Sequence, residues 1–220
     1  MAQAYFITGT DTEIGKTHAT CALLGTAAQQ GLRAVGLKPV AAGTDAAGHN
    51  EDVLRLMAAS NVMLPERTVN PWLLNAPLSP HIAARQAGIE ITTDPILSSF
   101  AAANESADFI LVEGVGGIYA PLSDSLSQPD LIQALDIPVI LVVGLRLGCL
   151  NHALLTAEAI KLHGLRFAGW IGNQIDPAFQ ALDDNLQTLE ARLSEPCLGI
   201  LPFQHSATDV SLASTLSLPQ

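Results

Sequence analysis

A glycine-bounded loop near the start of the chain constrains the fold more than any other stretch: Gly9-Thr10-Asp11-Thr12-Glu13-Ile14-Gly15-Lys16-Thr17. The apolar run before it predicts a strand, and the segment after it predicts a helix. At such a turn, backbone N–H groups and the partial positive charge of the helix N-terminus can surround phosphates. Lys16 is expected to reach the outer phosphates of a nucleotide, and the Thr17 hydroxyl to hold Mg²⁺. The order of strand, loop and helix favours this interpretation over a plain turn, although five residues separate the glycines instead of the usual four.

The composition predicts one domain with a large core. At 220 residues the chain is expected to form a single domain, residues 1–220, with a polar tail from about residue 205. Charged residues make up 14%, against roughly 25% in typical soluble domains, and hydrophobic residues make up 49%. The net charge of −11 and the scattered basic residues exclude an electrostatic surface for nucleic acid or an anionic membrane. A phosphate ligand must therefore be attracted by local groups.

The cysteines and the apolar runs indicate a cytoplasmic protein. Cys21, Cys149 and Cys197 are odd in number and lack paired spacing, as expected of reduced thiols. The start of the chain does not have the pattern of a signal peptide. The longest apolar run, residues 137–144, is far shorter than the ~20 residues that span a bilayer, and it predicts a buried strand.

Strand-like and helical patterns alternate along the whole chain. After the loop and its helix, residues 32–38 predict a second strand. Two strands joined by a helix form a right-handed parallel unit, so Lys38 is expected near the phosphate loop at the same sheet edge. We expect loops at residues 41–50 and 65–80, because four prolines exclude regular helix from the second. The pattern favours an α/β fold, a doubly wound and mostly parallel sheet flanked by helices.

A strand that ends in a carboxylate is the second informative stretch. Residues 109–112 are apolar, and Glu113 and a glycine-rich run follow them. In phosphate-loop enzymes an acidic residue at this place completes a magnesium site, because Mg²⁺ prefers hard oxygen ligands. The alternative is a charged residue that only closes a strand, and the phosphate loop makes this alternative weaker.

Five motifs, in the same order, resemble the signatures of the dethiobiotin synthetase family. They are the phosphate loop, Lys38-Pro39-Val40, Val112-Glu113-Gly114-Val115-Gly116-Gly117, Gly148-Cys149-Leu150-Asn151-His152 and Gly169-Trp170-Ile171-Gly172-Asn173. The similarity covers about residues 4–204 and implies a phosphate-loop NTPase fold. It also implies that ATP, CO₂ or bicarbonate, and 7,8-diaminopelargonate give dethiobiotin, ADP and phosphate in biotin synthesis. In that family a carbamate on one amine attacks the ATP γ-phosphate, and the second amine then closes the cyclic urea. ATP and Mg²⁺ as cofactors and a homodimer follow from the same resemblance.

The resemblance implies roles for individual residues. The expected catalytic residues are Lys38, Lys16 and Thr12. The expected magnesium ligands are Thr17, Asp52 and Glu113, of which Asp52 aligns least well. The expected nucleotide-binding residues are Glu13, Ile14, Gly15, Lys16, Thr17, His18, Asp52, Glu113, Gly114, Val115, Gly116, Asn173, Gln174, Pro202, Phe203, Gln204 and Asp209. Among them Asn173 would pair with the adenine N6 and N7 edge, because one amide can donate and accept at once.

The expected diamine-binding residues are Lys38, Ala42 and Asn151. Two of the family's features are missing near this site. A hydroxyl residue is common where Ala42 stands, so we expect either one fewer substrate hydrogen bond or a replacement by Thr44. The region around Asp184 lacks the tyrosine that the partner subunit would contribute. These differences bear on substrate affinity more than on the type of reaction.

Two other classes of protein share the phosphate loop. A partitioning or division-type ATPase switch generally carries a second lysine early in the loop, where this chain has Thr10-Asp11-Thr12. An amide-forming ligase related to cobyrinate or CTP synthesis should bring a glutaminase domain, for which 220 residues leave no room. The six histidines lack metal-binding spacing, and Cys149 lacks a paired base that would make it a nucleophile.

Overall fold

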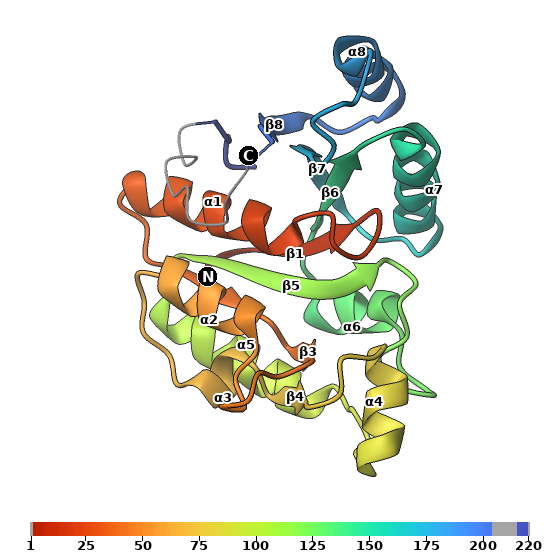
Figure 1. Ribbon diagram of the computed structural model, residues 1–220. Helices are drawn as coiled ribbons and strands as arrows, with labels where there is room; N and C mark the ends of the chain where they lie inside the picture. The colour runs from red at the N-terminus through yellow and green to blue at the C-terminus, as the bar shows by residue number, and fades with distance from the viewer. Residues whose placement is uncertain (1, 204–214, 220) are drawn as a thin grey trace.

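The computed structural model describes residues 2–203 and 215–219, and six parallel strands form the central sheet of this part of the chain (Figure 1). In spatial order the strands are β2 (Ala34–Leu37), β5 (Phe109–Gly117), β1 (Gln3–Gly9), β6 (Val139–Leu145), β7 (Phe167–Gln174) and β8 (Cys197–Leu201). A smaller parallel sheet joins β3 (Val40–Ala42) to β4 (Trp72–Leu74). The predicted parallel α/β fold is confirmed.

Helices cover both faces of the central sheet (Figure 1). They are α1 (Lys16–Gln29), α2 (Glu51–Ala59), α3 (Glu66–Val69), α4 (Pro80–Ala87), α5 (Asp94–Ser106), α6 (Gln128–Leu135), α7 (Cys149–Leu162) and α8 (Leu182–Arg192). Successive strand residues point to opposite faces, so Ile7 of β1 packs in the cluster with α1, whereas Phe6 packs in the cluster with α5 and α6. This arrangement is the doubly wound architecture that the alternating pattern predicts.

The carboxyl ends of the strands define the functional edge. β1 lies between β5 and β6. The strands β2 and β5 lie on one side of β1, and the later strands β6, β7 and β8 lie on the other, so the strand order reverses beside β1. Ligands of open α/β sheets bind in the crevice at such a point. The phosphate loop leaves β1 at this edge, and β2 and β5 bring Lys38 and Glu113 to the same edge.

Several predicted boundaries were wrong. The stretch 65–80, predicted as a loop, contains α3 and β4, because Pro65 and Pro71 lie just outside these short elements and interrupt neither. The predicted loop at 41–50 begins inside β3, which pairs with β4. β5 does not end at Glu113, as predicted, but continues to Gly117, and β1 pairs with it as far as that residue.

The predicted polar tail is also only partly correct. Residues 204–214 lie outside the described part of the chain. Beyond them, Leu216 is buried, and the Ser217 N–H donates a 2.7 Å hydrogen bond to the Leu198 carbonyl oxygen of β8. The end of the chain therefore packs on the sheet. Among the residues described, every helix is too short or too polar to cross a membrane.

Candidate functional site

The phosphate loop is held in shape by left-handed backbone and by Asp11. Gly15 has φ of +83°, and a Cβ there would lie 2.1 Å from Nδ2 of Asn173, so a larger residue would not fit. The Lys16 ammonium donates to the Asp11 carbonyl oxygen at 2.8 Å. The Asp11 carboxylate accepts from the Thr12 N–H at 2.8 Å and pairs with the Arg146 guanidinium at 2.8 Å. Asp11 thus links the positions of the two loop residues expected to be catalytic.

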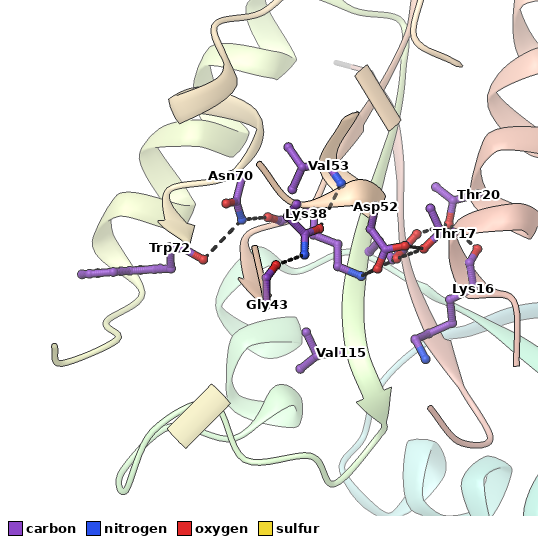
Figure 2. Close-up of polar contacts among 12 residues, drawn as sticks. Lys16, Thr17, Thr20, Lys38, Gly43, Asp52, Val53, Asn70, Trp72 and Val115 are labelled. Carbon is purple, nitrogen blue, oxygen red and sulfur yellow. Dashed lines mark hydrogen bonds and ion pairs between the residues drawn. The ribbon is translucent and has the colours of Figure 1, made fainter. Parts of the chain in front are cut away.

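A network of charged and polar side chains, in which Lys38 and Glu113 are buried, lies beside the loop (Figure 2). The Lys38 ammonium is 2.6 Å from Oε1 of Glu113 and 3.0 Å from Oδ2 of Asp52. The Thr17 hydroxyl lies 2.7 Å from the same Glu113 oxygen and 2.8 Å from Oδ1 of Asp52. Glu113 is fully buried, and its second oxygen accepts from the Thr20 hydroxyl at 2.8 Å. Two carboxylates, a hydroxyl and an ammonium therefore converge at one point.

The strand register explains this convergence. Leu37 of β2 pairs with Val112 of β5, so the residue after each of them, Lys38 and Glu113, comes to the same edge. Asp52 is brought by α2, whose first turn is capped by Asn50: the Asn50 side chain accepts from the Val53 N–H at 3.2 Å. The Asn50 amide also donates to the Gly43 carbonyl oxygen at 2.8 Å and so ties α2 to β3.

The network sets the protonation of its members. Burial and the nearby Lys38 charge lower the pKa of Lys16 to about 8, against the opposing pull of the carboxylates. Burial also acts to lower the pKa of Lys38, but Glu113 and Asp52 outweigh it and raise that pKa above its usual value. For Asp52, burial opposes ionisation, whereas the charge and hydrogen bond of Lys38 lower its pKa overall. Lys38 is therefore a cation, and Asp52 an anion, at neutral pH.

A cavity of about 820 Å³ opens over the loop and the network. The expected site residues that line it are Thr12, Glu13, Gly15, Lys16, Thr17, His18, Lys38, Ala42, Asp52, Glu113, Val115 and Gly116. Further lining residues were not predicted from the sequence: Asn50, Arg55, Pro77, Leu78, Ser79, Pro80, Ala120 and Pro121. Four of these residues, 77–80, come from the end of the proline-rich stretch that was predicted as a loop, whereas no sequence pattern pointed to Arg55. Lys16 and Lys38 therefore line the same cavity.

Two comparisons with known proteins decide the family. A family model described as an AAA domain matches residues 3–211. The ATP-dependent dethiobiotin synthetase BioD of Ralstonia nicotianae is 57% identical over 200 residues, covering 90% of this chain and 87% of that protein. The protein of the same name from Xanthomonas campestris pv. campestris is 48% identical over 220 residues, covering 99% and 98%. The chain belongs to the dethiobiotin synthetase family.

Solved structures similar to this member of the dethiobiotin synthetase family include a cell division protein and a ParA family ATPase. The MinD cell division protein of Aquifex aeolicus has a TM-score of 0.57 at 15% identity, covering 98% of this chain and 88% of that one. A ParA family ATPase from Chlorobium tepidum has a TM-score of 0.56 at 14% identity, covering 98% and 91%. At these identities the likeness shows the fold alone, so it does not support the switch alternative.

The residues that the dethiobiotin synthetase resemblance assigns to the adenine form a second group. Asn173, at the end of β7, donates to the Ile14 carbonyl oxygen of the phosphate loop at 2.8 Å. The Gln174 side chain accepts from the Phe203 N–H at 3.1 Å, which joins the ends of β7 and β8. Pro202 is exposed beside them. Gln204 and Asp209, assigned to the same group, lie outside the described residues.

Other residues assigned by the dethiobiotin synthetase resemblance have different surroundings. Gly114 is buried in β5, where an added Cβ would lie 2.2 Å from the Gln128 side chain. Glycine therefore allows β5 to pack closely against Gln128 of α6. Asn151 is exposed on α7 and does not line the cavity, nor does Thr44. Ala42 lines the cavity without a replacement hydroxyl from Thr44 beside it.

The oxygen donors at the carboxyl edge fit Mg²⁺. Thr17, Asp52 and Glu113 present hydroxyl and carboxylate oxygens, the donors that Mg²⁺ prefers while it keeps several waters. Within residues 2–203 and 215–219, no group of three or more His, Cys, Asp or Glu side chains is arranged to hold a metal. Burial raises the pKa of the Cys149 thiol, which makes it a poor nucleophile.

Proposed function

We propose that the chain catalyses the ATP-dependent ring closure of 7,8-diaminopelargonate with CO₂, forming dethiobiotin, ADP and phosphate. Family membership supplies the reaction. The observation that carries it to this chain is the pairing of Lys38 with Glu113, at 2.6 Å, on the wall of the cavity that Lys16 also lines. A lysine that is 5% exposed and held by two carboxylates is a placed cation, not a surface charge.

The two lysines address the main electrostatic obstacle of the reaction. A carbamate formed on the diamine and the triphosphate of ATP are both anionic, and they repel one another unless cations lie between them. The Lys16 ammonium, at the loop, is proposed to hold the outer phosphates. The Lys38 ammonium, across the cavity, is proposed to hold the carbamate oxygens as they approach the γ-phosphorus. Cations fixed in advance stabilise developing charge without reorganisation in the transition state.

Lys38 is also proposed to assist the second half of the reaction. Once the carbamate oxygen is bonded to the γ-phosphoryl group, the other amine attacks the carbamate carbon and phosphate leaves. Lys38 remains within reach of the oxygen on which negative charge gathers. Thr12, at the loop, is proposed to donate a hydrogen bond to the reacting groups. Its N–H is already held by Asp11, which restricts its position.

Magnesium completes the proposed site. Thr17, Asp52 and Glu113 would hold the ion, which neutralises phosphate charge when it is bound. One carboxylate oxygen each of Asp52 and Glu113 lies within 2.8 Å of the Thr17 hydroxyl, so the three groups already face a common point. The Lys38 ammonium also contacts these two carboxylates, so we propose that it would neutralise phosphate charge next to the ion.

The nucleotide and the diamine are proposed to enter from different sides. Asn173, with Gln174, Pro202, Phe203, Gln204 and Asp209, is proposed to hold the adenine beyond the phosphate loop. Ala42 and Lys38 are proposed to contact the diamine on the β3 side of the cavity. Asn151 is proposed as a further diamine contact from the start of α7, where exposed N–H groups suit a carboxylate.

A homodimer is also proposed. Leu147, two residues before α7, is 89% exposed, and Leu155 and Leu162 of that helix are 57% and 80% exposed. Such side chains favour a partner surface. Since Asn151 lies on this helix and outside the cavity of its own chain, a dimer formed through α7 would let Asn151 serve the partner's cavity. The three cysteines are free in the structure, in keeping with a proposed location in the cytoplasm.

One assay tests the proposed function. Purified protein with MgATP and bicarbonate should release phosphate only when 7,8-diaminopelargonate is added, and dethiobiotin should appear in equal amount. Phosphate release without the diamine, stimulated by DNA or lipid vesicles, would contradict the proposal and favour a switch ATPase. Size-exclusion chromatography with light scattering should give twice the chain mass of 23.0 kDa.

A further inference from the structure

The phosphate loop is longer than usual, and its backbone needs support from outside. Five residues separate Gly9 from Gly15, one more than in the usual phosphate loop. Glu13, one of the five, has φ of +59°, a value that a residue with a side chain adopts only at a cost in free energy. Such a conformation persists only where surrounding contacts fix it. The residues that hold this loop in place are therefore candidates for a role in the reaction.

The carboxyl ends of β6 and β7 hold the loop at both of its ends (Figure 1). At the first end, the Thr10 N–H donates to the Val142 carbonyl oxygen at 3.0 Å. The Thr10 hydroxyl accepts from the Gly144 N–H at 3.2 Å. At the other end, the Asn173 side chain donates to the Ile14 carbonyl oxygen at 2.8 Å. These bonds leave the middle of the loop to be fixed by other groups.

Asp11 fixes the middle of the loop. Its carboxylate accepts from the Thr12 N–H at 2.8 Å, and its carbonyl oxygen accepts from the Lys16 ammonium at 2.8 Å. The Arg146 guanidinium donates to the same carboxylate at 2.8 Å. Within the described part of the chain, Arg146 is the only residue outside the loop that bonds this carboxylate. Both loop residues proposed to act on the phosphates are thus connected to Arg146 through Asp11.

Arg146 lies between the loop and α7. It follows β6 and does not line the cavity. Its carbonyl oxygen accepts from the N–H of Cys149, the first residue of α7, at 3.0 Å, so its backbone is held at the start of that helix. A guanidinium stays charged at every relevant pH and pairs with a carboxylate in a defined geometry. Arg146 can therefore affect the cavity through Asp11 without touching the ligand.

We propose that Arg146 is a positioning residue for the reaction: by holding Asp11, it keeps Lys16 and Thr12 where the outer phosphates of the nucleotide meet them. This inference rests on the proposed function, because it takes MgATP as the ligand of the cavity. An ammonium has several N–H donors, so the bond from Lys16 to Asp11 leaves donors for phosphate oxygens. A loop that is fixed in advance need not be ordered when the nucleotide binds, and its donors need not reorganise in the transition state.

A double-variant cycle tests the inference. Arg146→Leu removes the guanidinium, Asp11→Asn removes the charge but keeps an acceptor for the Thr12 N–H, and a third variant carries both changes. Each single variant should raise the MgATP Kd by about fivefold and lower kcat by about tenfold. The double variant should lose no more than the single variants, because both changes remove the same pair. AMP, which lacks the outer phosphates, should bind as before. Calorimetry and steady-state kinetics measure these effects.

Arg166→Leu is the matched control. Arg166 pairs with Asp136 at 3.1 Å and is also partly exposed, but it lies just before β7, at the opposite edge of the sheet. This variant should keep the MgATP Kd and kcat of the unaltered protein. Arg146→Lys should recover part of the loss, since lysine keeps the charge without the planar fork. All variants should melt within a few degrees of the unaltered protein, because partly exposed ion pairs contribute little to stability.

Salt gives a readout that a purely structural role would not change. The side chains of Arg146 and Asp11 are 43% and 48% exposed, so dissolved ions screen their attraction. The ratio of the MgATP Kd of Arg146→Leu to that of the unaltered protein should therefore shrink between about 0.05 M and about 0.5 M salt. A ratio independent of salt would contradict the inference.

Three other results would overturn the inference. Unchanged MgATP affinity and turnover in Arg146→Leu would remove the role. Losses that multiply in the double variant would show that Arg146 and Asp11 act separately, and an equal loss in Arg166→Leu would reduce the effect to one of general charge. Absence of diamine-dependent turnover in the unaltered protein would contradict the proposed function alone, because the MgATP affinities would still decide whether Arg146 positions the loop.

Discussion

The side-chain amide of Asn70 donates a 2.5 Å hydrogen bond to the main-chain carbonyl oxygen of Lys38. The Lys38 N–H in turn donates to the Val69 carbonyl oxygen at 2.9 Å. The backbone of the proposed catalytic lysine is therefore fixed by the segment between α3 and β4, just after β2 has left the central sheet. Val69 and Asn70 thus position Lys38 without lining the cavity themselves.

Replacing Asn70 should show whether this residue positions Lys38 for turnover in addition to stabilising the fold. Asn70→Ala removes the bond to Lys38 and should lower the free energy of unfolding by about 1–3 kcal/mol. It should also lower kcat by about tenfold at unchanged MgATP affinity, because a displaced lysine loses its alignment. Asn61→Ala is the control, since Asn61 bonds the main chain at the other end of β2, through the Ala34 N–H and the Leu32 carbonyl oxygen. Denaturant titration and steady-state kinetics measure both effects, and an equal fall of kcat in the two variants would refute the positioning role.

Replacing Lys38 should abolish turnover and leave nucleotide binding. In Lys38→Gln the cation facing the carbamate is lost, whereas the loop and Lys16 remain. Turnover should fall by at least about 100-fold, as with the loss of other preorganised charge stabilisers. The MgATP Kd, measured by calorimetry, should stay within about threefold of its original value. Lys161→Gln, on the exposed side of α7, serves as the control. Near-normal turnover of Lys38→Gln would remove the proposed role.

Replacing Glu113 should weaken the binding of Mg²⁺ to the proposed site. Glu113→Gln keeps the size of the side chain and an acceptor for Thr20, but it removes a charge from the proposed metal site. The Mg²⁺ concentration for half-maximal phosphate release should rise by about 10- to 100-fold. The melting temperature should also fall, because Lys38 keeps only Asp52 as a charged partner. Glu158→Gln, exposed on α7, is the control, and an unchanged Mg²⁺ requirement would exclude Glu113 as a ligand.

The pair of Arg33 and Asp108 should make stability depend on pH. The hydrogen bond from the Arg33 side chain lowers the pKa of Asp108 from 3.8 to about 2. Because the folded value is the lower one, the stabilisation is present above the unfolded pKa and is lost as the pH falls from about 4 to about 2.

Asp108→Asn should therefore melt below the unaltered protein at pH 6, and the gap should narrow steadily as the pH falls below 4. Melting temperatures across this range check the prediction. Glu90→Gln, which is exposed and makes no ion pair within the described residues, is the control. A gap that stays constant down to pH 2 would show that the charge of Asp108 contributes nothing.

Local sequence determined the elements and much of the candidate site. The phosphate loop was readable because glycine at position 15 and the Lys-Thr pair after it are demanded by the loop's own backbone and chemistry. The buried strands were readable because unbroken apolar runs are required of parallel strands covered on both faces. The proximity of Lys38 to the loop followed from the handedness of one strand-helix-strand unit.

Only the tertiary structure decided which side chains meet. β5 lies between β1 and β2, and the resulting register places Glu113 beside Lys38, although 75 residues separate them in the chain. The same holds for Arg55, for Asn70 and for the packing of residues 215–219 on β8. Propensity and periodicity describe interactions between residues a few positions apart. These contacts join residues that are distant in the chain, and their energies arise only when helices and strands bury their apolar faces against one another.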